Sequence, residues 1–222
     1  MAYSTIAVAN AFIERAKGAK ITDLTPMKLQ KLVFFAQSWS LKILDKPLVE
    51  DFFAKWTYGP VQPQLYHAVK DYQNHHISTL ISTLEFTEDG GFQTVTPEFV
   101  DEVGDFRCII DNIITVYGHM TAANLSRLTH LPGSAWAKAG DEQAVLDNKL
   151  LKECIVIEEG RFMSQAEFPF NFELDRMQKM VSGDFVTVPD GLETLDDFDD
   201  WLRKVESGCG SSICERGLKL SC

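Results

Sequence analysis

Histidine and cysteine are the side chains of this chain best suited to bind a metal ion or attack a substrate, and there are five of each. None of the histidines has a partner ligand at a standard zinc spacing such as His-Glu-x-x-His. Cys108 and Cys154 lie in apolar segments, which is typical of buried, unreactive thiols. The other cysteines crowd the C-terminal end among glycine and serine, and their irregular spacing favours a flexible tail over a metal site: Cys209, Cys214 and Cys222.

Glycine and serine motifs likewise indicate no catalytic chemistry. No glycine-rich loop matches a phosphate-binding or dinucleotide-binding motif, and no Gly-x-Ser-x-Gly nucleophile elbow occurs. The sequence therefore predicts no catalytic residue, no metal site and no cofactor. An enzyme whose site these motifs do not cover stays open as an alternative.

A long helix over residues 27–44 is the first element that must position any binding residue. Thr25 supplies a capping hydroxyl, and Pro26 occupies the first helical position. On a helical wheel most large apolar side chains fall in one broad sector. Lys28, Lys31 and Lys42 gather on the opposite side, so they form a candidate contact face.

Two glutamines lie between that apolar sector and a second apolar strip of the same helix. A helix packed on more than one side would enclose the amides of Gln30 and Gln37. Buried amides need fixed hydrogen-bond partners, so we favour a structural role for both residues over direct ligand contact.

A half-buried strand is expected next, because Phe52, Ala54, Trp56 and Tyr58 alternate onto one side before Gly59-Pro60 ends the strand. Apolar side chains recur at helical spacing after Thr96-Pro97, which repeats the hydroxyl–proline helix start. The resulting seam is too short for a coiled coil, which favours an intramolecular packing face; whether it joins two copies of the chain stays open. Its members are Phe99, Val103, Phe106, Ile110, Ile113 and Tyr117.

Other capping and turn signals predict helices over about residues 5–18, after Pro63, after Thr121, and from Ser134 or Asp141 to about Cys154. An Asp-Gly-Gly turn predicts two short strands over residues 84–95. The expected fold is a compact, mainly α domain with a small β element (α+β) over residues 5–153. An acidic C-terminal extension follows over residues 154–222.

Charge limits the class of partner. The chain has 21 lysines and arginines against 32 acidic residues, a net charge of −11, which opposes attraction to phosphate backbones and anionic lipid. Nucleic acid is therefore not expected as the main partner. No apolar run is long enough to cross a bilayer and no secretory signal is visible, so we expect a cytoplasmic protein without membrane contact.

The acidic extension has a helical pattern of its own. Residues 184–206 contain eight acidic residues but only two basic ones, Arg203 and Lys204, and apolar side chains such as Phe198 and Trp201 recur at helical spacing. The pattern predicts an acidic amphipathic helix, either docked on the body or free to contact a partner. Docking is favoured because these apolar side chains are costly to leave in water.

The most specific signal is a composite of three segments. Residues 24–41 read Leu-Thr-Pro-Met-Lys-Leu-Gln-Lys-Leu-Val-Phe-Phe-Ala-Gln-Ser-Trp-Ser-Leu, Lys46-Pro-Leu follows, and residues 54–66 read Ala-Lys-Trp-Thr-Tyr-Gly-Pro-Val-Gln-Pro-Gln-Leu-Tyr. Together they resemble the Panacea domain, the SocA-like or GepA-like antitoxin family of bacteria and their phages. The resemblance covers about residues 5–153, with a weaker match at residues 125–136.

This resemblance implies a binding protein and not an enzyme. Members of the family are antitoxins that neutralise a toxin encoded beside them through direct protein–protein contact. Some members instead deliver the toxin to an ATP-dependent protease, so an adaptor role is the alternative.

Interface cores favour aromatic anchors ringed by polar groups, which suggests the contact residues. A structural role, fastening the strand to the long helix, is the favoured interpretation of Trp56 and Tyr58. The candidate toxin-binding residues are Lys28, Lys31, Trp56, Tyr58, Gly59 and Pro60 in the domain, and Phe198 and Trp201 in the acidic extension.

Overall fold

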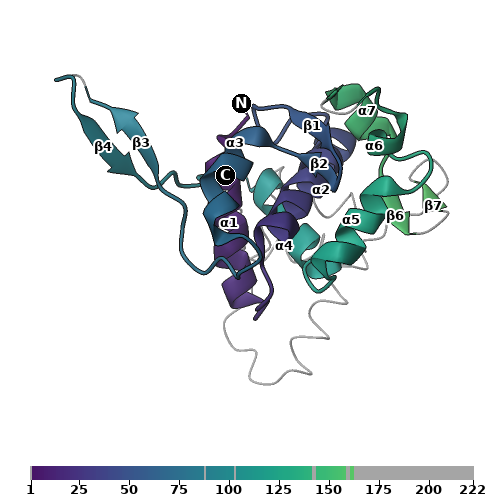
Figure 1. Cartoon of the computed structure of the whole chain (residues 1–222), viewed down its shortest axis with the longest axis horizontal. Coiled ribbons are helices and arrows are strands. Elements are labelled where there is room, and N and C mark those ends of the chain that lie inside the picture. The colour runs from purple at the N-terminus through teal and green to yellow at the C-terminus, as the bar shows by residue number, and fades with distance from the viewer. Residues whose placement is uncertain (1, 88, 103, 142–143, 159–160, 163–222) are drawn as a thin grey trace, which may run out of the picture. The chain divides into compact units, whose positions relative to one another are not determined.

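The structure is a computed structural model that describes residues 2–87, 89–102, 104–141, 144–158 and 161–162. Within these ranges the chain is mainly helical with three small antiparallel sheets, which confirms the predicted fold class (Figure 1). The acidic segment, with Phe198 and Trp201, and the three C-terminal cysteines lie outside the described residues. No helix in the described ranges is both long and apolar enough to span a membrane.

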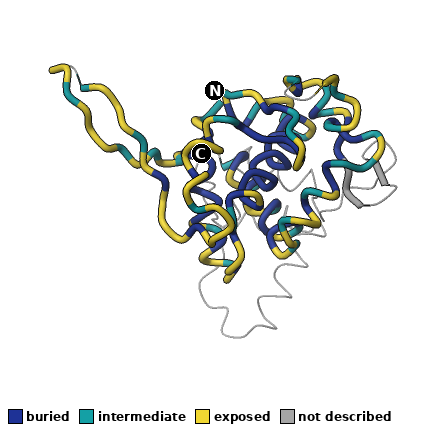
Figure 2. The backbone as a smooth tube through the Cα atoms, viewed as in Figure 1, coloured by how far each residue is buried: buried dark blue, intermediate teal, exposed yellow. Residues whose placement is uncertain are grey.

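Helix α2, Pro26–Leu44, is the centre of the fold. Its start is the predicted one, since the Thr25 hydroxyl accepts a hydrogen bond from Lys28 N and Pro26 takes the first helical position. Neighbours on several sides bury most of its length (Figure 2). The helices packed against it are α1 (Thr5–Gly18), α3 (Pro63–Val69), α4 (Asp105–Tyr117), α5 (Ala122–His130) and α7 (Asn148–Glu153).

Gln37 has the structural role that the sequence predicted. Its Oε1 accepts hydrogen bonds from Leu48 N at 2.8 Å and Val49 N at 3.0 Å, and its Nε2 donates to Asn148 Oδ1 at 3.1 Å. The buried amide thus connects α2 to the following loop and to α7, as expected for a buried polar group with fixed partners.

Helix α4 begins later than the sequence predicted. The hydroxyl–proline signal at Thr96-Pro97 does not start it, because Gly104 has a φ of +87° and interrupts helical geometry just before Asp105. Asp101 Oδ2 instead accepts a hydrogen bond from Arg107 N in the first turn. The apolar seam is intramolecular over its helical part, where four side chains are buried: Phe106, Ile110, Ile113 and Tyr117.

A three-stranded sheet with the order β2-β1-β5 packs beside α2. Strands β1 (Phe53–Trp56) and β2 (Gly59–Val61) form a hairpin, and β5 (Val145–Leu146) pairs with the other edge of β1. The predicted alternation fails at both ends of the segment: Ala54 is buried and Trp56 half-buried as expected, but Phe52 and Tyr58 are exposed, and Phe53 of the other face is buried. Phe53 packs edge-on against Phe34 of α2, so this short strand has buried side chains on both of its faces.

A second hairpin, β3 (Thr83–Phe86) with β4 (Phe92–Val95), confirms the predicted pair of strands around the Asp-Gly-Gly turn. It stands clear of the helices, and most of its residues are exposed (Figures 1 and 2). The remaining elements are a short 3-10 helix (Lys70–Tyr72), α6 (Ala135–Lys138), β6 (Val156–Glu158) and β7 (Arg161–Phe162).

Candidate functional site

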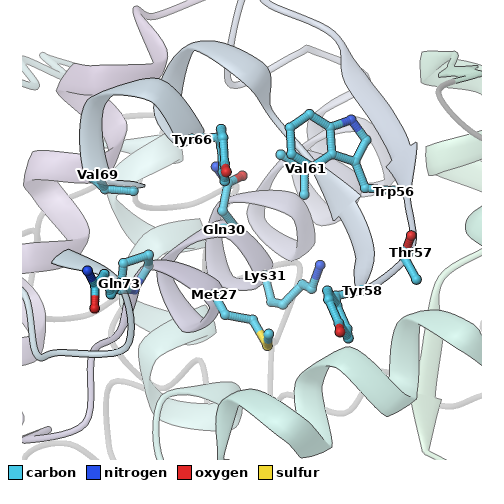
Figure 3. A pocket seen from close by; sticks show the side chains of 11 residues that line it. Met27, Gln30, Lys31, Trp56, Thr57, Tyr58, Val61, Tyr66, Val69 and Gln73 are labelled. Carbon is cyan, nitrogen blue, oxygen red and sulfur yellow. The ribbon is translucent and has the colours of Figure 1, made fainter. Parts of the chain in front are cut away.

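A pocket of about 560 Å³ opens between the first turns of α2, the β1–β2 turn and α3 (Figure 3). Its volume falls in the usual range for a ligand or side-chain pocket, and its lining is mostly apolar and aromatic. The lining residues are Pro26, Met27, Gln30, Lys31, Trp56, Thr57, Tyr58, Val61, Tyr66, Val69 and Gln73.

Gln30 fixes one wall of the pocket. Its Nε2 donates to Gln62 O at 3.1 Å, and its Oε1 accepts from Gln62 N at 2.9 Å. The Gln62 side chain in turn accepts from Leu65 N and caps the start of α3. Gln30 therefore positions the connection between β2 and α3, which confirms its predicted structural role.

Lys31 places a buried amine against the pocket. Figure 3 shows its side chain extending from α2 toward the turn that carries Thr57 and Tyr58. Its Nζ donates to Pro60 O at 2.9 Å, and no described carboxylate forms an ion pair with it. Burial disfavours the charged form and lowers the pKa of Lys31 to about 7. Among the described residues, the amine thus has a neutral carbonyl as its partner and no counter-charge.

Gly59 allows the close approach of this amine. Its φ is +99°, and a Cβ added there would lie 2.7 Å from Lys31 Nζ and in collision with Thr129 Oγ1. Only glycine fits this position without displacing the lysine. Gly59 and Pro60 are buried, so the structure gives them a role in holding Lys31 and none on the outer surface.

Three side chains from α5 and α6 hold the β1–β2 turn through its backbone carbonyls. Ser126 Oγ donates to Tyr58 O at 2.9 Å and Trp136 Nε1 donates to Trp56 O at 2.8 Å. His130 Nε2 lies 3.0 Å from Thr57 O. The sequence reasoning missed these residues, although they fall within residues 125–136, where the resemblance was weaker. The turn is a fixed platform because each of its carbonyls has a partner.

The side chains of Trp56 and Tyr58 differ in how far they are buried. The half-buried Trp56 ring packs edge-on against Tyr66 of α3, with the ring centroids 4.8 Å apart. Tyr58 is 70% exposed and also lines the pocket. Trp56 thus contributes to packing on α3, while the Tyr58 ring stays available at the pocket rim.

The expected lysine face is not a surface of the molecule. Lys28 and Lys31 are fully buried, and only Lys42 of the three is exposed. The helical wheel assigned the lysines to a solvent side, but neighbouring elements enclose α2 on that side as well. Lys28 Nζ forms an ion pair with Asp23 Oδ1 at 2.5 Å, which compensates its burial.

The described residues offer little for catalysis at this pocket. Lys31 is the one charged side chain among the lining residues, and no acid or histidine lines the pocket with it as a general acid–base partner. In the described ranges, no group of three or more histidine, cysteine, aspartate or glutamate side chains could hold a metal ion. Burial raises the pKa of the Cys108 thiol, which keeps it in its less nucleophilic protonated form.

Comparison with known proteins shows which domain this part of the chain resembles. Residues 29–137 match the family model described as "Antitoxin SocA-like, Panacea domain", so the chain contains a SocA-like Panacea domain, and the predicted resemblance is confirmed. The chain is also 28% identical over 130 residues to Antitoxin SocA of Caulobacter vibrioides (strain NA1000 / CB15N). That alignment covers 59% of this chain and 66% of SocA, just short of two thirds of the relative. No solved structure matches the chain.

Proposed function

We propose that this chain is the antitoxin of a toxin–antitoxin pair and that it neutralises its toxin by direct binding. The observation that carries the proposal is the Panacea domain match over residues 29–137, together with the similarity to Antitoxin SocA. The lining of the pocket supports a binding role, since it combines aromatic side chains with one buried amine and offers no acid–base pair.

The pocket and its rim are the proposed contact site within the domain. Tyr58 serves as an exposed aromatic anchor, and Lys31 receives an acidic group that the toxin inserts beside an apolar side chain. A stable contact buries about 800 Å² on each partner, so the pocket would be the centre of a larger interface. The acidic segment with Phe198 and Trp201 remains a second proposed contact, suited by charge to a basic toxin surface.

The mechanism we propose is masking, in which the antitoxin covers the functional surface of the toxin. Co-expression with the protein encoded in the neighbouring reading frame tests it. Masking predicts that the neighbour is toxic alone, that this chain restores growth, and that an intact complex can be purified. A toxin level that falls on co-expression would instead support the adaptor role. A neighbour that is harmless, or that this chain neither binds nor rescues, would contradict an antitoxin function.

Tyr58→Ala tests the proposed contact site. We expect the dissociation constant for the toxin to rise about tenfold or more, since an exposed aromatic anchor at an interface centre contributes strongly to affinity. Stability should change little because the ring is exposed and the turn is held by its carbonyls. Val100→Ala, at an exposed apolar residue that does not line the pocket, is the control and should bind like the wild type.

A further inference from the structure

Residues 83–95, here called the arm, present an apolar face to solvent. The register pairs Leu84 with Thr94 and Phe86 with Phe92, so these four side chains share one face of the hairpin. Leu84, Phe86 and Phe92 are 71%, 78% and 65% exposed. The two phenylalanine rings lie together with centroids 4.4 Å apart. The opposite face carries Thr83, Glu85, Gln93 and Val95.

This clustering differs from ordinary surface hydrophobicity. Single exposed apolar residues are common, whereas contiguous apolar patches usually mark binding surfaces. An isolated two-stranded hairpin is marginally stable in water, so a hairpin with one uncovered apolar face gains stability when a second surface covers it. The arm therefore has the physical character of a docking element.

The body holds the arm firmly at its base. Buried Asn10 of α1 accepts a hydrogen bond from Ile81 N at 2.8 Å, and its Nδ2 donates to Ile81 O at 3.0 Å and to Pro97 O at 2.9 Å. A single side chain thus binds the segments on both sides of the arm. The Ser82 and Thr96 hydroxyls also lie 2.8 Å apart, which brings the two ends together.

Charge distinguishes among the surfaces that could cover the arm. Residues 83–95 contain three acidic residues and no lysine or arginine, and the whole chain has a net charge of −11. Glu85 belongs to the opposite face of the hairpin, whereas Asp89 lies in the turn between its two strands. A second copy of the chain packed face to face would bring like charges together, which disfavours self-association. An apolar patch bordered by lysine or arginine would be complementary in both hydrophobicity and charge.

We propose that the apolar face of the arm is a docking surface for the toxin, and that the toxin presents there an apolar patch bordered by basic side chains. This inference rests on the proposed antitoxin function. It adds a contact that is separate from the pocket and is built on a different element of the fold.

The affinity of purified arm variants for the toxin encoded in the neighbouring reading frame tests the proposal. The triple variant Leu84→Ser, Phe86→Ser, Phe92→Ser should raise the dissociation constant at least about tenfold and weaken growth rescue. The matched control Thr83→Ser, Gln93→Ser alters the opposite face and should stay within about twofold of the wild type. Reversing the charge in the turn with Asp89→Lys should also weaken binding, most strongly at low ionic strength.

A deletion variant of the full chain tests whether the triple variant loses binding only because it misfolds. The ends of the arm meet at Asn10, so a Gly-Ser-Gly turn can join Ser82 to Thr96 in place of the arm. This variant should keep a folded body with an unchanged thermal transition. It should bind the toxin as poorly as the triple variant.

Several outcomes would overturn the inference. Wild-type affinity in the triple variant, or an equal loss in the control, would show that the arm does not dock the toxin. If the triple variant dissociates a dimer and leaves toxin affinity unchanged, the occupant is a second copy and the proposal is wrong. If the wild-type chain itself fails to bind or rescue, the antitoxin function fails together with the inference.

Discussion

Lys31 is buried and no carboxylate of the described residues pairs with it, which is costly for a charged group. Its one hydrogen-bond partner among the described residues is the neutral carbonyl of Pro60, so the fold tolerates the amine by lowering its pKa to about 7. The amine is therefore partly neutral at physiological pH. Its protonation therefore links the stability of the domain to pH.

Lys31→Met should remove a pH dependence of stability. An unfolded lysine has a pKa of about 10.4, and the folded value is about 7. Between these values the unfolded state binds the extra proton, so the wild-type free energy of unfolding rises with pH, by up to about 1.4 kcal/mol per unit. Below about pH 7 both states are protonated and this contribution is flat. Denaturant titrations between about pH 6 and 10 measure the slope.

Lys42→Met is the control for that experiment, because Lys42 is an exposed lysine on the same helix. It should keep the wild-type slope. Other groups that titrate at high pH, such as Tyr117, whose pKa burial raises to about 12, are present in all three proteins and cancel in the comparison. Parallel curves for the wild type and Lys31→Met would refute the assigned role of the buried amine.

Individual site residues were predictable to different degrees. Gln30 and Gln37 could be assigned fixed partners because an amide between two apolar strips has to be enclosed. Ser126, His130 and Trp136 could not, since they bond to a turn that lies 68 to 80 residues away in sequence. The partners of such residues depend on tertiary packing and leave no local pattern.

At the level of elements, local signals succeeded where no distant contact competed with them. The caps of α2 and α5 and the β3–β4 turn follow from neighbouring residues. The start of α4 does not, because Asn10 binds Pro97 O and Gly104 adopts a left-handed conformation before the helix. The alternation in β1 was also mistaken, since short strands with neighbours on both faces lose the period-two signal.

Asn10→Ala should destabilise the domain by about 1–3 kcal/mol, because Ile81 N and two carbonyls would lose their partner in a buried site. Hydrogen exchange should accelerate most in residues 81–97, since the base of the arm is released. Denaturant unfolding gives the stability change. Asn112→Ala, where the amide bonds to Cys108 O within its own helix, should cost less; equal costs and unchanged exchange in the arm would contradict this role for Asn10.

At the scale of the whole molecule, the fold class followed from the helical patterns, but the arrangement around α2 did not. Periodicity assigns each helix an apolar face without saying which other helix covers it. The prediction for α2 suffered most from this missing information, because a helix enclosed on several sides has no true solvent face. The predicted division at residues 153 and 154, and the role of the acidic extension, stay predictions.

Removal of residues 184–222 tests the acidic extension. If the segment steers the antitoxin toward a basic toxin surface, the truncated chain should associate more slowly and lose most of the salt dependence of its association rate. Stopped-flow or biosensor kinetics at two salt concentrations measure this effect. A chain that lacks only residues 207–222 loses the three C-terminal cysteines, keeps the acidic segment, and should behave like the wild type. Unchanged kinetics and neutralisation in the longer truncation would rule the hypothesis out.

The hydrogen bonds of Asn10 to the backbone on both sides of residues 83–95 affect which substitutions the arm tolerates. The bonds reach main-chain atoms of Ile81 and Pro97, so they impose no demand on the amino acids in between. Substitutions in that stretch therefore leave these hydrogen bonds to the body in place. In the proposed docking role, a change within residues 83–95 would alter which toxin surface is bound, while the rest of the domain keeps its structure.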